Sequence, residues 1–350
     1  MEKMLGAVYH KKKDQNTGII RLENVDIPQI KSGNQVLIEV KACGICGTDL
    51  KITEGGHPAN DNIILGHEFS GIVKEVGNQV SDIKIGDKVT IDPNEKCGVC
   101  KFCRRGLSNL CEYLATGTTF GIFQDGGFAK YCSVPRGAVY KLPEKINLES
   151  AALVEPLSCA VHCHNIADVK ESDNVIIIGA GPMGLIIESV IRTHPIKKLI
   201  CIEIDKWRNK KAKELGADYT INPTEVDVNK EIEKLTNGNG ADVIIDAVGI
   251  SNTFEMAQKI WAPGARLVCF GQDSRAVAKI KPNDIVRYQR KIFGSYIGTA
   301  SDFLDAIELL ANNVVDANKL ISHKIPLSEL LTKGFKLMKE RKCVKIITIP

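Results

Sequence analysis

Three side chains early in the sequence can bind a borderline-soft metal ion. Cys46 carries a thiol, and the adjacent pair His67 and Glu68 adds an imidazole and a carboxylate. Such a ligand set suits zinc, and a site with few firm ligands keeps a coordination position open for a substrate. The hydroxyl of Thr48 stands two residues after Cys46, where it can pass protons to or from an oxygen at the metal. Together these residues predict a catalytic zinc site.

Four further cysteines lie close together in the sequence. Cys97, Cys100 and Cys103 are separated by two residues each, and Cys111 follows after seven more. Four thiolates at such spacings can complete a tetrahedron around zinc, which is the pattern of a structural site. The first three cysteines also match the start of an iron–sulfur motif, but no proline follows the fourth. We therefore expect a structural zinc here, and two zinc ions per chain.

The middle of the chain carries the pattern of a dinucleotide-binding fold. The apolar segment Asn174–Ile178 is typical of a buried strand, and a second one, Leu199–Ile202, is followed by the acidic residue Glu203. A glycine-rich turn and a helical segment lie between them. A strand, a tight turn, a helix, a strand and an acidic residue in this order form a Rossmann fingerprint. The turn comprises Gly179, Ala180, Gly181, Pro182, Met183 and Gly184.

The glycines and the acidic residue of this fingerprint have separate tasks. Gly179 permits the tight turn, Gly181 lets the backbone approach a pyrophosphate, and Gly184 lets the helix pack closely on the strand. The carboxylate of Glu203 would accept hydrogen bonds from the adenosine ribose and repel a 2′-phosphate, which favours NAD over NADP. Arg208 lies nearby and could stack on the adenine or bond the ribose, and it leaves NADP as an alternative.

Hydrophobic periodicity divides the chain into two kinds of structure. The first part reads as strands separated by turns, and no helix of convincing period precedes Leu148. Beyond that point helices alternate with apolar strands, as in a doubly wound parallel sheet. Gly249 and Gly271 end two of these strands, at the edge where an open α/β sheet binds its ligand. The final strand-like segment, Lys345–Ile349, is expected to rejoin the first domain.

Composition limits the classes of function. The 350 residues are 44% hydrophobic and 25% charged, with a net charge of +4, as is typical of globular proteins. No basic block interleaved with aromatic residues indicates nucleic-acid binding, and no apolar run is long enough to span a membrane. The N-terminal residues lack the apolar core of a signal peptide, so we expect a cytoplasmic, reducing location. The 12 cysteines should then be thiols or metal ligands.

Taken together, these motifs resemble the zinc-containing medium-chain dehydrogenase family. The motifs occur in the family's order and are Gly44–Asp49, Gly66–Gly71 with Gly77, the four-cysteine loop, Glu155–Pro156, and Gly179–Gly184 with Glu203. The resemblance implies an α/β fold with a GroES-like, β-rich catalytic domain formed by residues 1–153 and 296–350. It also implies an inserted Rossmann NAD-binding domain, a doubly wound parallel sheet, over residues 154–295.

The resemblance also implies roles for individual residues. Cys46 and His67 would be ligands of the catalytic zinc, and Glu68 would be a ligand or an alternating one. Glu155 stands where many members carry a cysteine, and it would bind zinc directly or bond a zinc-held water. Asp49 would orient His67 through a hydrogen bond.

The same resemblance implies a reaction and a substrate class. Zinc would lower the pKa of a substrate hydroxyl while hydride passes to the nicotinamide. The oxygen-rich ligand set and the segment Glu155–Ser158 are similar to the sorbitol and polyol dehydrogenase branch, which oxidises a secondary alcohol to a ketose. Two residues depart from relatives, because Ile297 replaces an arginine of animal-type sorbitol dehydrogenases and Lys51 replaces a histidine that completes the proton relay.

Several alternatives stay open. The substrate could be a sugar-alcohol phosphate of the galactitol-1-phosphate type, L-threonine or butanediol. A chain of another class, a non-catalytic NAD-binding sensor, would keep the fold but need not keep the zinc ligands. The resemblance further implies a homotetramer or a homodimer.

Overall fold

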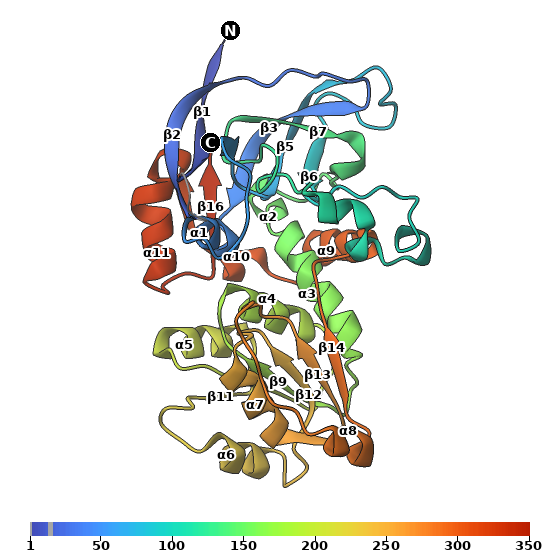
Figure 1. The fold of residues 1–350 in the computed structure, drawn as a ribbon, viewed down its shortest axis with the longest axis vertical. Helices are drawn as coiled ribbons and strands as arrows, with labels where there is room; N and C mark the ends of the chain where they lie inside the picture. Colours follow the sequence, from blue (N-terminus) through green and yellow to red (C-terminus); the bar gives the residue numbers. More distant parts are fainter. Residues whose placement is uncertain (1, 13–16) are drawn as a thin grey trace. The chain divides into compact units, whose positions relative to one another are not determined.

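The computed structural model describes residues 2–12 and 17–350, which form two compact units (Figure 1). The first unit comprises Met1–Pro156 and Thr299–Pro350, and the second unit comprises Leu157–Gly298. The chain therefore leaves the first unit once and returns to it once.

The first unit consists mainly of antiparallel strands in two sheets. Its strands are β1 (Lys3–Lys11), β2 (Gly18–Asp26), β3 (Gln35–Gly44), β4 (Ile63–Ile64), β5 (Glu68–Val76), β6 (Lys88–Ile91), β7 (Tyr131–Pro135), β8 (Val139–Lys141), β15 (Ile321–Pro326) and β16 (Lys345–Ile349). One sheet has the order β2-β1-β4, and the larger has the order β15-β16-β3-β5-β6-β8, with β7 also paired to β3. Val36, Ile38 and Val40 alternate along β3 and lie in the core of this unit.

The C-terminal strand belongs to the first unit, as the sequence predicted. Ile347 and Thr348 of β16 pair with Gly44 and Cys43 at the end of β3. In Figure 1 the red terminal strand accordingly lies among the blue N-terminal strands. The last residues of the chain are thus brought next to the first metal-binding motif.

The helices of the first unit are short. They are α1 (Gly47–Thr53), α2 (Leu148–Ala151), α9 (Ala300–Ala311), α10 (Ala317–Leu320), α11 (Phe335–Lys339) and the first turn of α3 (Val154–Ala167). Helix α1 shows that the prediction of no helix before Leu148 was wrong. Its seven residues are too few to display a helical period. A local contact stabilises it instead, because the Asp49 carboxylate accepts a hydrogen bond from the Cys46 N–H at 2.8 Å.

The second unit contains a six-stranded parallel sheet, as the alternation of helices and strands predicted. Its strands are β9 (Asn174–Ile178), β10 (Lys198–Ile202), β11 (Tyr219–Ile221), β12 (Ala241–Asp246), β13 (Trp261–Cys269) and β14 (Lys291–Gly294). Their order is β11-β10-β9-β12-β13-β14. The connecting helices are α4 (Pro182–Ile191), α5 (Lys206–Leu215), α6 (Val228–Leu235), α7 (Ser251–Ile260) and α8 (Pro282–Tyr288). All five residues of β9 are buried, because a central parallel strand is covered on both faces.

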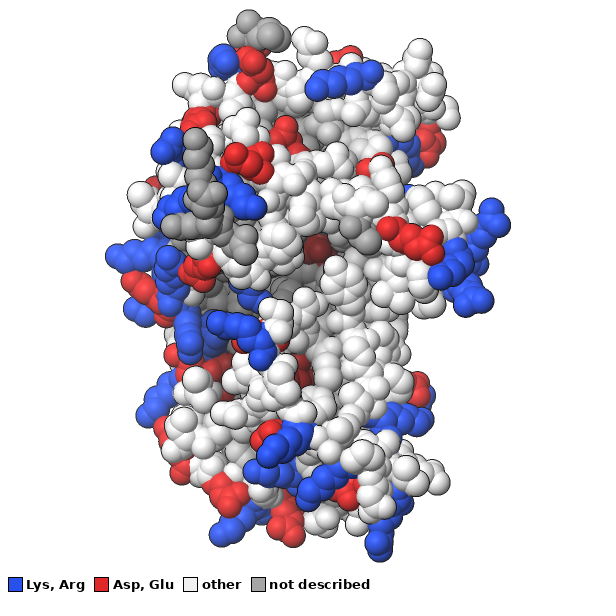
Figure 2. Space-filling model, viewed as in Figure 1, with Lys and Arg blue, Asp and Glu red and all other residues white. Residues whose placement is uncertain are grey.

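Charged side chains of both signs are interspersed over the face of the molecule drawn in Figure 2. Within the described part of the chain, no helix combines the length and the apolar character needed to cross a membrane.

The second unit contains a carboxyl group that is completely buried, which is unusual for an acidic side chain. Glu188 lies on α4 with a relative exposure of 0%. Neither of its carboxyl oxygens makes a hydrogen bond of ordinary geometry with the described residues. Burial raises the pKa of Glu188 to about 9, and the nearby backbone N–H of Ala217 together with the charges of Arg192 and Lys213 offsets this only in part. Glu188 is therefore protonated in the folded protein at neutral pH.

This raised pKa predicts how stability depends on pH. The pKa of Glu188 is higher in the folded chain than in the unfolded chain. Its stabilising contribution to the free energy of unfolding is therefore complete below about pH 4 and is lost as pH rises toward 9. Glu188→Gln removes the titration and should stabilise the second unit at pH 8.5 by roughly 1–3 kcal/mol relative to its effect at pH 5. Urea unfolding at both pH values measures the difference. Glu233→Gln, an exposed carboxyl on α6, is the control, and an equal effect of the two variants would contradict the prediction.

Candidate active site and metal centres

The start of helix α1 positions the first predicted metal ligand. Cys46 directly precedes the helix, and its N–H is fixed by Asp49 as described above. The Cys46 Sγ lies 3.6 Å from the hydroxyl oxygen of Thr48. The thiol and the hydroxyl therefore lie side by side at the end of β3.

A tight turn before β5 positions the second and third predicted ligands. Gly66 has a φ of +95°, and a Cβ there would lie 2.7 Å from the ring of Phe128, so only glycine fits. The turn places His67 and Glu68 next to Cys46. Ligand atoms of Cys46, His67 and Glu68 all lie within 4.8 Å of one another, which is close enough to share one metal ion.

His67 and Asp49 face each other in a buried, charged environment. Both side chains are buried, and the Nδ1 of His67 lies 3.7 Å from the Asp49 carboxylate. Neither this nitrogen nor the facing Oδ1 has a hydrogen-bond partner in the described part of the chain. Burial raises the pKa of Asp49 to about 6. Burial alone would lower the pKa of His67, but the Cys46 thiolate and Asp49 hold it well above its usual value. This donor set fits a zinc ion, whose positive charge would stabilise the buried anions.

Glu155 belongs to the same buried, charged environment. It lies in the first turn of α3 and is 8% exposed. Burial raises the pKa of Glu155, whereas the nearby charge of His67 opposes the rise and that of Glu68 adds to it. The Glu155 carboxyl is thus within electrostatic reach of the predicted ligands, although it comes from a distant part of the sequence.

The structure adds a residue that sequence reasoning missed. The Lys345 Nζ lies 2.6 Å from both carboxylate oxygens of Glu68, and both side chains are almost completely buried. Burial alone would lower the pKa of Lys345, but Glu68 and the other anions of the site raise it. A lysine at the start of an otherwise apolar strand was the available signal, because a buried lysine requires a partner.

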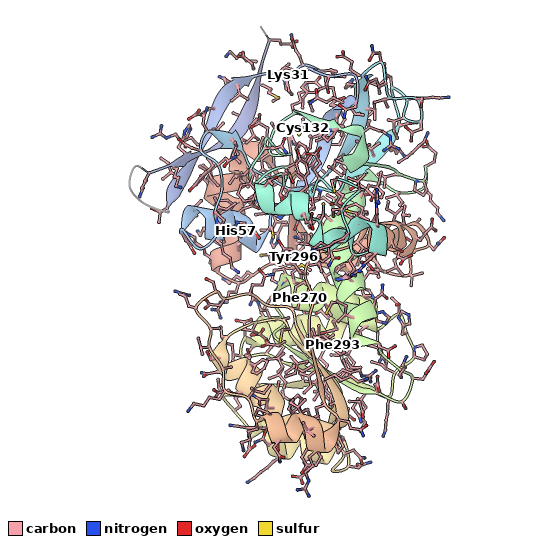
Figure 3. The ribbon with its side chains drawn as sticks, turned by 45° about the vertical axis from the view of Figure 1, so that its right-hand side comes forward. Lys31, His57, Cys132, Phe270, Phe293 and Tyr296 are labelled. Carbon is pink, nitrogen blue, oxygen red and sulfur yellow. The ribbon has the colours of Figure 1, made fainter. Side chains whose placement is uncertain are left out.

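A histidine lies at the edge of this environment. His57, labelled in Figure 3, follows α1, and its Nδ1 lies 2.8 Å from the Pro58 carbonyl oxygen. Burial lowers the pKa of His57, and the charges of His67 and Lys51 add to that effect. Among the described residues, His57 is not part of the cluster of Cys46, His67 and Glu68.

The four-cysteine loop forms a second donor cluster. Its ligand atoms lie within 4.8 Å of one another, and the Sγ atoms of Cys97 and Cys111 are 3.5 Å apart without a disulfide. Backbone N–H groups of Cys97 and Cys100 donate to sulfur atoms of the cluster at 3.3 Å. Such amide–sulfur bonds stabilise thiolates. The arrangement of four converging sulfur atoms fits a closed tetrahedral zinc site.

The glycine-rich turn of the second unit forms a cradle at the start of α4. Gly179 has a φ of +96°, and a Cβ on Gly184 would lie 1.9 Å from the carbonyl oxygen of Gly179. Gly181 has ordinary extended backbone as the N-cap, and Pro182 and Met183 begin the helix. A Cβ on Gly181 would meet only the Nη1 of Arg208, at 4.0 Å. Glycine therefore keeps this space open, which fits a pyrophosphate at a helix N-terminus.

Two other predicted cofactor contacts have local structural partners. The Glu203 carboxylate accepts hydrogen bonds from the N–H groups of Ala180 and Asp205, at 2.8 and 2.9 Å. A Cβ on Gly249 would lie 2.2 Å from the backbone of Gly271, so these glycines permit two strand ends to approach each other. The hydrogen bond from Ala180 thus holds Glu203, which directly follows β10, next to the glycine-rich turn.

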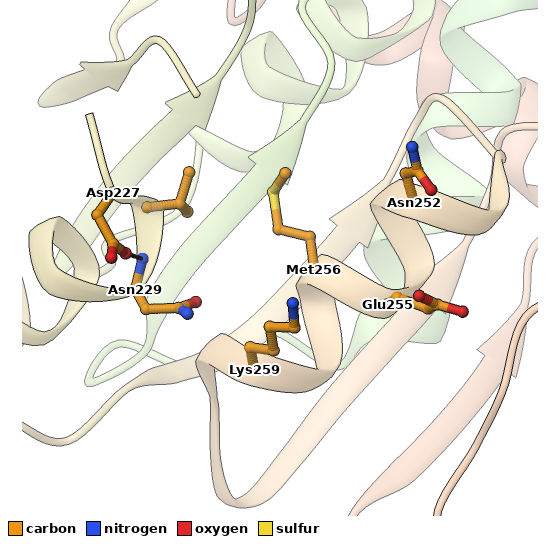
Figure 4. Close-up of a pocket in the computed structure, with 7 residues that line it drawn as sticks. Asp227, Asn229, Asn252, Glu255, Met256 and Lys259 are labelled. Atoms are coloured by element: carbon orange, nitrogen blue, oxygen red, sulfur yellow. Dashed lines mark hydrogen bonds between the residues drawn. The ribbon is translucent and has the colours of Figure 1, made fainter. Parts of the chain in front are cut away.

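A further pocket lies away from all of these residues. It has a volume of about 290 Å³ and lies between α6 and α7 (Figure 4). Its lining is Asp227, Val228, Asn229, Asn252, Glu255, Met256 and Lys259. None of the predicted site residues contributes to it.

Comparison with known proteins now defines the class. Residues 32–144 match the alcohol dehydrogenase GroES-like domain, and residues 182–312 match the zinc-binding dehydrogenase domain. The chain is 34% identical over 311 residues to D-xylulose reductase A of Aspergillus oryzae, covering 87% of this chain and 86% of that protein. It is 32% identical over 319 residues to a sorbitol dehydrogenase of Halalkalibacterium halodurans, covering 91% of this chain and 92% of that protein. The chain belongs to the zinc-containing medium-chain dehydrogenase family.

Solved structures agree with this assignment. The 2R,3R-butanediol dehydrogenase of Bacillus subtilis aligns with a TM-score of 0.89 and 32% identity over 99% of both chains. A zinc-binding dehydrogenase of Sinorhizobium meliloti bound to NADP aligns with a TM-score of 0.88 and 31% identity over the whole of both chains. Galactitol-1-phosphate dehydrogenase of Escherichia coli aligns with a TM-score of 0.88 and 27% identity over the whole of both chains. The present chain is accordingly a dehydrogenase that uses zinc and a nicotinamide dinucleotide.

The open space at Gly181 gives a test of the cradle. Gly181→Leu should weaken dinucleotide binding by at least about tenfold, because the side chain fills the space that the pyrophosphate needs. The fold should persist, since only the end of Arg208 is displaced. Quenching of protein fluorescence by NADH measures the affinity. Gly137→Leu, at an equally open glycine of the first unit, is the control, and unchanged affinity in Gly181→Leu would contradict the assignment.

Proposed function

We propose that the chain is a zinc-dependent polyol dehydrogenase, which transfers a hydride from a secondary alcohol of a sugar alcohol to NAD and forms a ketose. The observation that carries this proposal is the oxygen-rich donor cluster of the first unit. Cys46 is its one thiol, and the other donors are His67, Glu68 and the neighbouring Glu155. Carboxylates suit a substrate with several hydroxyl groups. The similarity to a D-xylulose reductase and a sorbitol dehydrogenase supports the same substrate class.

Residues of the first unit would hold the metal and move the proton. Cys46, His67 and Glu68 would hold the catalytic zinc, and Glu155 would bind it directly or bond a zinc-held water. When bound, zinc supplies Lewis acidity to the substrate oxygen, and the nicotinamide ring accepts the hydride. Thr48 would accept the proton that the substrate hydroxyl releases. Asp49 would hold the imidazole of His67 in orientation.

The proton must then leave the site. Lys51 follows Thr48 by three residues on α1, so the two side chains lie on the same face of the helix. We assign the outward step from Thr48 to water, or to the amine of Lys51 after its ammonium has released a proton to the solvent. The overall reaction balances, because the substrate loses a hydride from carbon and a proton from oxygen while NAD becomes NADH.

Charge around the cradle supports NAD as the dinucleotide. Glu203 is 6% exposed and is fixed to two backbone N–H groups beside the glycine turn. An anion held there would repel a 2′-phosphate. The Nη1 of Arg208 lies 4.0 Å from the Cβ position of Gly181, from where it would contact a phosphate or ribose oxygen.

Substrate choice is tested by steady-state kinetics. Purified, zinc-replete protein should reduce NAD faster with sorbitol or xylitol than with hexitol phosphates at equal concentration, and kcat/KM should be higher for NAD than for NADP. Sorbitol 6-phosphate and galactitol 1-phosphate are the matched comparisons. A higher rate with a phosphate ester would transfer the assignment to the sugar-alcohol-phosphate class, and inactivity with every alcohol would support a non-catalytic sensor.

Removal of the thiol tests the metal site itself. Cys46→Ala should lower turnover by at least about a thousandfold and reduce zinc content from two ions to one per chain, because one firm donor is lost. NADH binding should stay unchanged, since the cradle lies in the other unit. Zinc content is read by elemental analysis.

Cys43→Ala is the matched control, because burial raises the pKa of Cys43 well above its usual value and keeps it a thiol. It should retain two zinc ions and turnover. Retained turnover in Cys46→Ala would remove the catalytic-zinc assignment.

A further inference from the structure

A buried carboxylate holds the turn between β12 and α7. Asp246 is the last residue of β12 and is almost completely buried. One of its oxygens accepts hydrogen bonds from the N–H groups of Val248 and Gly249, both at 3.0 Å. The other oxygen accepts from the hydroxyl of Thr253, in the first turn of α7, at 2.9 Å. Burial raises the pKa of Asp246, and these three donors oppose the rise. The carboxylate thus joins the strand end, the turn and the helix.

The turn that Asp246 holds packs directly on the glycine-rich turn. A Cβ on Gly179 would lie 2.5 Å from the Cγ2 of Val248, and a Cβ on Gly184 would lie 3.5 Å from the Cβ of Ala247. These distances leave no room for a side chain at Gly179 and bring the two turns into contact. Because a close-packed interior transmits displacements, a shift of one turn displaces the other.

The contact between the turns lies where an open parallel sheet binds its ligand. Strands β9 and β12 are neighbours in the middle of the sheet, and the chain continues from β9 to β10 on one side and returns to β12 on the other. Asp246 is opposite Ile178, which ends β9. The carboxyl ends of two such strands form the crevice at a topological switch point. The carboxylate therefore lies beneath the backbone that would line the dinucleotide site.

We propose that Asp246 is a positioning residue for the dinucleotide, which fixes the β12–α7 turn so that this turn braces the glycine-rich cradle. Both of its oxygens are occupied by donors of the chain, so it acts through Val248 and Gly249 and not on the ligand itself. A cradle that is fixed before binding spares the ligand the entropic cost of ordering the turn. The inference rests on the cradle described above and does not depend on which alcohol is the substrate.

Asp246→Asn tests this role by dinucleotide binding, which does not require turnover. Asparagine keeps the size of the side chain but loses the charge that strengthens the hydrogen bonds from the turn. The dissociation constant of NADH, measured by fluorescence quenching, should rise about tenfold or more. ADP-ribose carries the pyrophosphate without the nicotinamide, and in competition with NADH it should lose affinity by the same factor. In steady-state kinetics, KM for NAD should rise while kcat at saturating NAD does not fall.

Asp242→Asn is the matched control. Asp242 lies at the other end of β12, where its carboxylate accepts from the N–H and the side-chain amide of Asn174, at 2.8 and 2.9 Å. Its replacement removes a comparable charged acceptor far from the crevice, so urea unfolding should show a similar loss of stability. The affinities for NADH and ADP-ribose should stay within about twofold of wild type, because distant sites act independently. An equal loss of affinity in the two variants would reveal general destabilisation and overturn the inference.

Thr253→Val provides a second test if Asp246→Asn fails to fold. Valine keeps the shape of threonine but removes the hydroxyl that donates to Asp246, so NADH affinity should fall about threefold or more. Thr253→Ser keeps the hydroxyl and should restore the affinity. The control is Thr236→Val, which removes a buried hydroxyl bonded to Ile232 and Gly240 at the end of α6 and should leave the affinity unchanged.

Three results would contradict the role of Asp246. One is an unchanged NADH affinity in Asp246→Asn, and another is an equal affinity of Thr253→Val and Thr253→Ser. The third is a loss of NADH affinity without a loss of ADP-ribose affinity, which would place the effect at the nicotinamide and not at the cradle. All of these measurements are made without an alcohol, so they are independent of the proposed substrate class.

Discussion

The antiparallel pairing of β3 with β5 is the constraint on which the candidate active site depends. Gly44 is opposite Glu68 in this ladder, and Cys43 is opposite Phe69. The chain just beyond the end of β3 must therefore lie beside the chain just before the start of β5. Cys46 follows the end of β3 by two residues, and His67 directly precedes β5. A shift of register by one residue would turn the side chains to the opposite face and separate the donors.

The same ladder explains why a distant strand completes the site. Strand β16 pairs with β3 at Gly44 and Cys43, on the edge of β3 next to the metal-binding residues. The first residue of β16 is Lys345, so sheet pairing alone brings an ammonium to Glu68. Metal binding and the pairing of the chain's end are thus coupled, since loss of β16 would leave Glu68 buried without a partner.

Much of the fold and of the candidate site could be predicted because it is encoded locally. The four cysteines and the glycine fingerprint each fall within one short segment, and their chemistry follows from residue type and spacing. Burial of β9 also follows from its continuous apolar run. Helix α1 could not be predicted, because a single side-chain contact replaces the helical period that a longer helix shows.

Other features could not be predicted because they depend on pairing between distant segments. The contact of Lys345 with Glu68 spans 277 residues, and periodicity carries no information at that distance. Gly249 and Gly271 were predicted as ligand contacts from their place at strand ends. The structure gives them a second reason, because each would clash with the backbone of the other if it carried a Cβ.

Charge balance joins these observations. A Cys46 thiolate and the carboxylates of Glu68 and the nearby Glu155 would together carry more negative charge than one divalent cation neutralises. Lys345 removes one carboxylate from that sum by forming a sealed pair with Glu68. On the proposed function, the two positive charges of zinc would offset further negative charge in the site, and His67 would bind the metal as a neutral imidazole. The metal would then attract the oxygen of an uncharged alcohol. The buried lysine thus neutralises part of the negative charge that the oxygen-rich site brings together.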